Sequence, residues 1–200
     1  MNMRKKYLML PLLAAIISSC TPDNPENKYD VILQQYEGEY ELESMEWIPE
    51  GGKTMVVDIN DDKQASNDLL EEILVLHDGV KLNHTKFNPD YGKRSGTFSV
   101  KIPILDYYQT EEVYSGNITS SHQCFLKANI GEDGSMTSGV FDHLEWADED
   151  RIGVWTFGGV SMESATPERI VLNVDRYMVY DFRTSKKMIG KVLVTLTRYK

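Results

Sequence analysis

The chain has 200 residues, a formal net charge of −10 at pH 7 and only two cysteines. A chain of this length fits one folded domain. Its acidity repels phosphate backbones and no stripe of basic residues reverses that locally, so nucleic acid is excluded as an expected partner.

The first twenty residues have the organisation of an export signal. A basic cluster, Arg4-Lys5-Lys6, precedes an uncharged apolar run from Leu8 to Ile17, which is too short to span a bilayer as a helix. Ser18 and Ser19 follow, directly before Cys20. The run Ile17-Ser-Ser-Cys20 resembles the lipobox of bacterial lipoproteins. That resemblance implies that residues 1–19 are a signal peptide and that Cys20 carries the lipid anchor, with palmitate among its acyl groups.

Residues 20–28 are polar and rich in proline, and such a composition predicts a flexible tether. The folded domain is expected over 29–200. Thr21 stands where an aspartate would signal retention in the inner membrane, so we expect a lipid-anchored protein of the cell envelope at the outer membrane, on its periplasmic face or at the cell surface. Cys124 is left alone for disulfide formation and is predicted to be a small buried hydrophobe.

Beyond Tyr36, apolar residues alternate with polar ones at a period of two, which predicts half-buried strands. Between Glu39 and Trp47 the apolar parity switches, so a β-bulge is expected near Ser44. A second strand is predicted over Thr97–Ile104. Its Pro103 cannot donate to a ladder and indicates a sheet edge or a strand end.

The remaining strands follow the same pattern. They are predicted at Val80–Phe87, His122–Ile130, Ser135–Leu144, Gly153–Phe157, Arg169–Val174, Tyr177–Arg183 and Gly190–Tyr199. Glu132-Asp-Gly134 predicts a tight hairpin turn, because Asp-Gly readily adopts positive φ angles. Polar loops are expected over Asp106–Ser121 and Ser161–Glu168.

One segment, Ser66–Leu76, has helical spacing instead. Asp68 followed by Glu71 fits a capping box, and Gly79 is placed to end the helix. The predicted fold class is therefore all-β with one short helix: an antiparallel up-and-down β-barrel, or alternatively a β-sandwich.

Three stretches together resemble the lipocalin-like lipoproteins of Bacteroidota. They are the opening strand Gly-Glu-Tyr-Glu-Leu (Gly38–Leu42), the acidic loop leading into Asp-Leu-Leu-Glu (Asp68–Glu71), and the closing Val-Leu-Val-Thr-Leu-Thr-Arg-Tyr (Val192–Tyr199). The resemblance implies a lipocalin-like barrel with an internal cavity as one option. It says more about fold than about biochemical role.

The acidic loop contains the most specific local motif. Oxygen-bearing side chains recur with the spacing of an EF-hand-type calcium loop, and the predicted ligands are Asp58, Asn60, Asp62, Gln64, Ser66 and Asp68. Three features depart from that motif: Lys63 replaces the usual glycine, the closing acid comes one position early, and no glutamate clamps the ion unless Glu71 or Glu72 turns back. The alternative is a solvated acidic turn that caps the helix.

Aromatic residues suggest a second kind of site. Trp47, Trp146, Trp155 and Phe157 are candidates for lining a cavity or stacking on sugar rings, and the alternative is that they fill the core. No nucleophile elbow or phosphate-binding glycine loop is present, so a non-enzyme is expected. The leading expectation is a non-catalytic module that binds a small apolar or glycan ligand. The alternative is a structural or accessory subunit of a surface protein complex.

Overall fold

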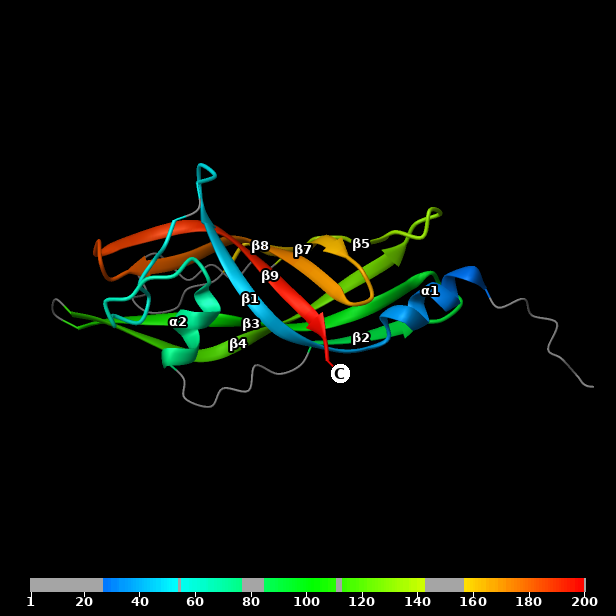
Figure 1. Ribbon diagram of the computed structural model, residues 1–200, viewed down its shortest axis with the longest axis horizontal. Coiled ribbons are helices and arrows are strands. Elements are labelled where there is room, and N and C mark those ends of the chain that lie inside the picture. The colour runs from blue at the N-terminus through cyan, green and yellow to red at the C-terminus, as the bar shows by residue number, and fades with distance from the viewer. Residues whose placement is uncertain (1–26, 54, 77–84, 111–112, 143–156, 200) are drawn as a thin grey trace, which may run out of the picture.

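The computed structural model describes residues 27–53, 55–76, 85–110, 113–142 and 157–199. These residues form two helices and nine strands (Figure 1). In chain order they are α1 (Lys28–Tyr36), β1 (Gly38–Pro49), α2 (Leu69–Leu76), β2 (Thr85–Asp90), β3 (Ser95–Thr110), β4 (Val113–Ile130), β5 (Met136–Ser138), β6 (Phe141–Asp142), β7 (Gly159–Ala165), β8 (Arg169–Asp181) and β9 (Lys186–Arg198). Neither helix is long and apolar enough to cross a membrane.

All nine strands belong to one antiparallel sheet in the order β5-β4-β3-β2-β1-β9-β8-β7-β6. Neighbours in the sheet are neighbours in the chain, except that the first strand, β1, pairs with the last, β9. This is an up-and-down meander that curls into a nearly closed barrel, as the sequence predicted. The β-sandwich alternative fails for the described residues, because every strand lies in one continuous ladder.

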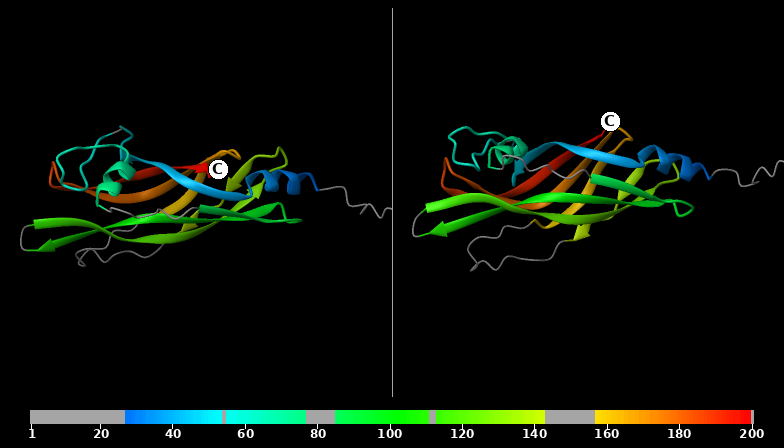
Figure 2. Two further views of the ribbon diagram at one scale, coloured as in Figure 1. Left: turned by 60° about the horizontal axis from the view of Figure 1, so that its bottom comes forward. Right: turned by 90° about the horizontal axis from the view of Figure 1, so that it is seen from below.

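The barrel is flattened into two layers (Figure 2). Strands β1, β9 and β8 lie over strands β2, β3 and β4, and α1 lies at one end. At the seam, β5 faces β7, where the backbone N–H of Met162 donates to the Ser138 hydroxyl at 2.8 Å. The predicted strand Ser135–Leu144 is in fact two, because β5 pairs with β4 and β6 pairs with β7. The chain thus crosses the seam at Gly139 and Val140.

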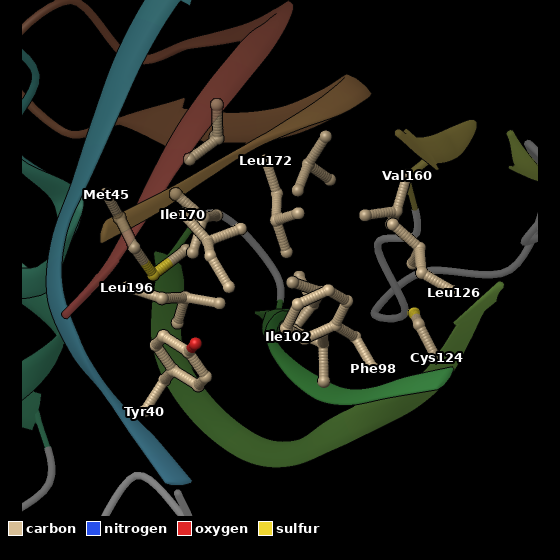
Figure 3. Packing of buried hydrophobic residues seen from close by; sticks show 14 of the residues in the cluster. Tyr40, Met45, Phe98, Ile102, Cys124, Leu126, Val160, Ile170, Leu172 and Leu196 are labelled. Atoms are coloured by element: carbon tan, nitrogen blue, oxygen red, sulfur yellow. The ribbon is translucent and has the colours of Figure 1, made fainter. Parts of the chain in front are cut away.

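Side chains from both layers fill the space between them (Figure 3). Tyr40, Phe98, Ile102 and Leu172 are 0% exposed, and Leu196 is 2% exposed. A side chain bordering a hollow large enough for water would have accessible area there. The barrel interior around these residues is therefore a packed core. Cys124 is also fully buried within it, and burial raises the pKa of its thiol to about 12, so it stays protonated as predicted for a small hydrophobe.

Helix α1 covers the end of the barrel and was not predicted. The Asn27 side chain caps it by accepting from the Tyr29 N–H at 3.2 Å. Tyr29, Leu33 and Tyr36 share its buried face. Arg198 ties the helix to β9: its guanidinium donates to the carbonyls of Gln35 and Glu37, which lie at the helix C-terminus.

Several sequence predictions are confirmed. The β1–β9 register shifts between Leu42 and Ser44, which is the expected bulge. Gly134 has a φ of 86° in the β4–β5 turn and donates to the Gly131 carbonyl at 3.1 Å. Pro103 lies within β3 at an edge position, since among the described residues β2 accompanies β3 only as far as the pair Lys86–Ser99.

The first loop prediction is wrong, and the second is right only for residues 166–168, the turn between β7 and β8. Residues predicted as the loop Asp106–Ser121 extend β3 and β4 into one long hairpin, paired as far as Thr110 with Val113. The predicted loop Ser161–Glu168 begins with strand β7, whose register shift between Met162 and Ser164 breaks the alternation that would have revealed it. Residues 143–156, with most of the predicted strand Gly153–Phe157, lie outside the described part, as do 77–84 with Gly79.

Candidate metal site

The acidic loop lies between β1 and α2. One backbone bridge closes the loop on itself, and other backbone hydrogen bonds hold it to the barrel. Val57 and Ser66 form an isolated bridge, with N–O distances of 2.9 and 3.0 Å in the two directions. The backbone N–H of Trp47 donates to the Asn67 carbonyl at 2.8 Å, and this hydrogen bond fixes the loop against β1. Val57 and Ile59 are fully buried. The loop is therefore anchored by its apolar residues, which leaves its polar residues arranged around Asp58.

Asp58 organises the turn. Its carboxylate is fully buried and accepts two backbone N–H groups, from Asp61 at 2.7 Å and from Lys63 at 3.1 Å. Asn60 accepts from the Asp62 N–H at 2.9 Å, and Asp62 accepts from the Gln64 N–H at 2.7 Å. Each of these side chains thus accepts a backbone N–H from a residue two to five positions later, and these hydrogen bonds fix the conformation of the loop. Each carboxylate oxygen that accepts one N–H keeps a second lone pair for a further donor or a cation.

Asp61 and Lys63 have φ angles of 63° and 71°. Lys63 thus adopts the left-handed conformation that glycine supplies at this place in the calcium motif. Its ammonium pairs with the exposed Asp61 carboxylate, so the positive charge is held on the outer side of the loop. The cost of lysine at this position is therefore strain in its backbone conformation.

Glu72 turns back from α2 onto the loop. Its carboxylate is almost fully buried and accepts from the Ile59 N–H at 3.2 Å. One carboxylate oxygen from each of Asp58, Asp62 and Glu72 lies within 4.8 Å of the other two. Burial raises the pKa of Glu72 to about 7; the charges of Asp62 and Asp58 add to this, and the Ile59 hydrogen bond opposes it.

The structure divides the predicted ligands into two groups. Asp58 and Asp62 converge with Glu72, and Asn60 lies beside them, its side-chain NH₂ donating to the Glu72 carbonyl at 3.3 Å. Asp68 instead caps α2, accepting from the Leu70 N–H at 3.0 Å and from the Met45 N–H at 2.7 Å.

Ser66 is likewise engaged elsewhere: its hydroxyl contacts Glu71 at 2.7 Å and accepts from the Asp68 N–H. Glu71 therefore completes a variant of the predicted capping box through Ser66. Gln64 is exposed, and its backbone N–H serves Asp62.

Asp181, at the end of β8, binds the backbone of the acidic loop at Asp58. It is fully buried, and its carboxylate accepts from the Asp58 N–H at 3.0 Å, the Thr184 hydroxyl at 2.8 Å and the Arg183 side chain at 3.3 Å. Burial acts to raise the pKa of Asp181, but these hydrogen bonds outweigh it and lower the pKa below its usual value. No local sequence pattern identifies this residue, because the contact joins positions 123 apart.

The donor set fits a hard cation. Three carboxylates and an amide side chain supply oxygens of the kind that calcium prefers, and an ion would relieve the repulsion among the acids. The Asp58 carboxylate is already oriented by its two N–H donors. A calcium ion would be held by Asp58, Asp62 and Glu72, with Asn60 beside them, rather than by the six residues predicted. Calcium binding itself stays a prediction.

The other predicted site residues divide between the core and the undescribed part of the chain. Trp47 is 0% exposed and Phe157 is 3% exposed, so both contribute to the core. The indole N–H of Trp47 is buried and has no hydrogen-bond partner among the described residues. Trp146 and Trp155, as well as the lipidation site Cys20, lie outside the described residues.

Comparisons of this chain with protein-family models, with curated proteins and with solved structures found no match.

Proposed function

We propose that the mature chain is a lipid-anchored protein of the cell envelope, and that its barrel is a non-catalytic module acting through its outer surface as an accessory subunit of a surface protein complex. The observation that carries this choice is the filled interior. Tyr40, Phe98 and Leu172 lie between the two layers with no exposed area. Pockets for small ligands typically have volumes of about 300–1,000 Å³, and these side chains leave no such space around them.

The acidic loop has a structural part in this proposal. It joins β1 to α2 and contacts the β8–β9 turn through Asp58 and Asp181. A cation bound there would hold that end of the barrel in one conformation, so that the outer surface is presented rigidly. This role requires no chemistry at the ion.

Binding of a small apolar or glycan ligand is the rival proposal. Of its four aromatic candidates, Trp47 and Phe157 are buried in the core. Its remaining support is the predicted pair Trp146 and Trp155. A ligand held by that pair would have to bind outside the packed part of the barrel.

Purification of the full-length protein from its native envelope in mild detergent tests the anchor and the function separately. Intact mass should show cleavage before Cys20 and added acyl chains, and both should be lost in a Cys20→Ala variant. Native mass spectrometry then distinguishes the two functions. A stoichiometric protein complex without organic ligand supports the accessory subunit, whereas a monomer carrying an organic mass would overturn it in favour of the rival.

A further inference from the structure

The outer side of strands β2, β3 and β4 carries lysines around an exposed aromatic ring. We name this surface the lysine face and define it by Lys86, Lys101, Phe125 and Lys127. Phe125 is 56% exposed and lies on β4 between the buried Cys124 and Leu126, so it points outward. The four residues lie on adjacent strands, because Ser99 of β3 pairs with both Lys86 and Phe125. The result is a compact basic surface on an acidic domain.

The outward charges of β1 are acidic, unlike those of the lysine face, although Arg169 of β8 lies 4.0 Å from one of them, Glu43. Strand β1 lies in the opposite layer (Figure 2). Its Glu41 and Glu43 are exposed and its Glu46 is half-buried. Strands are spaced about 4.8 Å apart, so β4 lies about 14 Å from β1 along the sheet. That distance exceeds the screening length of about 8 Å at physiological salt, so the β1 acids do not neutralise Lys127.

Among the residues that the structure describes, two acids lie at the margins of the lysine face. Glu39 of β1 is opposite Lys86 in the sheet register. Asp90, at the end of β2, is paired with Lys93 at 3.1 Å. Lys101 and Lys127, which flank Phe125, are therefore the charges that define the face, and we expect them to contribute most to binding.

We propose that the lysine face docks on a membrane surface of anionic lipid headgroups. Lysine side chains extend their ammonium groups to phosphate, and a phenylalanine between them enters the interface. The position of the predicted anchor is compatible with this orientation. Helix α1, from which the tether leaves, contacts the β2–β3 turn, where the Gly92 N–H donates to Asp30 at 2.8 Å and Arg94 stacks on the Tyr29 ring.

This inference rests on the anchoring part of the proposed function. Residues 20–27, fully extended, reach about 28 Å, so an acylated Cys20 keeps the domain within that distance of the bilayer. The high effective concentration lets a weak face bind. Anionic lipid is favoured over an acidic protein because the proposed tether would already hold the domain near headgroups. The face would orient the barrel, with the acidic β1 side turned away from the membrane.

Flotation with lipid vesicles tests the face without the anchor. The mature chain from residue 20 to residue 200, with Cys20→Ser to prevent acylation, is mixed with vesicles of phosphatidylcholine alone or of phosphatidylcholine and phosphatidylglycerol. We expect binding to the mixed vesicles only, and weakening at high salt. The double variant Lys101→Ala/Lys127→Ala should bind about thirtyfold more weakly. Phe125→Ala should also reduce binding.

The matched control is Lys53→Ala/Lys186→Ala, which removes the same charge from exposed positions outside the lysine face. It should bind like the parent. Equal losses in the two double variants would overturn the proposal, as would absence of binding or equal binding to neutral vesicles. Circular dichroism checks that each variant is folded. Because this chain carries no lipid, the result is independent of whether Cys20 is acylated in cells.

Discussion

The Tyr177 hydroxyl donates to the Pro103 carbonyl at 2.9 Å and so joins β8 to β3 across the flattened barrel. Both residues are buried. A buried hydrogen bond of this kind contributes about 1 kcal/mol, and more is lost when its acceptor is left unpaired. The contact links the two layers at a point where no backbone ladder joins these strands.

Tyr177→Phe should lower the free energy of unfolding by about 1–2 kcal/mol, because the Pro103 carbonyl loses its donor. Urea denaturation of the mature chain measures the change. Tyr29→Phe is the matched control, since it removes a hydroxyl for which the described residues provide no hydrogen bond. Equal effects of the two substitutions would show that the contact contributes nothing specific.

Calcium at millimolar concentration should raise the thermal midpoint, because an ion that binds only the folded state stabilises it by mass action. Asp62→Asn and Glu72→Gln should each abolish that rise and remove any calcium mass seen by native mass spectrometry. Asp61→Asn alters an exposed acid of the same loop outside the three-carboxylate cluster and should keep the response. No shift with calcium in the parent would leave the loop as an acidic turn and helix cap.

Without divalent cation, stability should fall as pH rises from about 4.5 to about 7. The folded-state pKa of Glu72 is raised from 4.5 to about 7 mainly by burial, so in this window the folded state binds more protons than the unfolded state. The full shift corresponds to a loss of about 3 kcal/mol. Glu72→Gln should flatten this part of the profile, measured by urea denaturation in chelator. An unchanged slope in the variant would assign it to other groups.

Lys63→Gly should stabilise the loop, because glycine adopts a φ of 71° without the steric cost that a Cβ imposes. We expect a gain of about 1 kcal/mol, read from the thermal midpoint at low salt in chelator. Lys63→Ala separates this effect from charge, since it removes the same ammonium but keeps the Cβ. A gain in both variants would point to electrostatics rather than backbone conformation.

Much of the barrel could be predicted because its strands obey a local rule. Alternation located β1 and its bulge, and Asp133-Gly134 located a turn. Strand β7 was missed because its own bulge disrupts the alternation. The polar composition of residues 20–28 gives no sign of helix α1, although Tyr29, Leu33 and Tyr36 recur at helical spacing.

The candidate site was predictable only in its loop half. The Asp-x-Asn-x-Asp spacing identified Asp58 and Asp62, since Asx-type turns are encoded within a few residues. The acid that closes the site is determined by how α2 packs against the loop. This packing directs Glu72 toward the loop, whereas Asp68 caps the helix. The support from Asp181 arises from tertiary contact alone.

Pairing of β1 with β9 has a consequence for how the chain would fold if it is exported as proposed. Tyr40 is opposite Arg198, so the ladder that closes the barrel joins residues from the two ends of the domain. Such long-range contacts carry a large loop-closure entropy and slow folding. A chain that crosses a membrane from its N-terminus would expose β1 first and β9 last. The edge of β1 would then stay open until translocation is complete, and in that interval an exported chain would most need protection from aggregation.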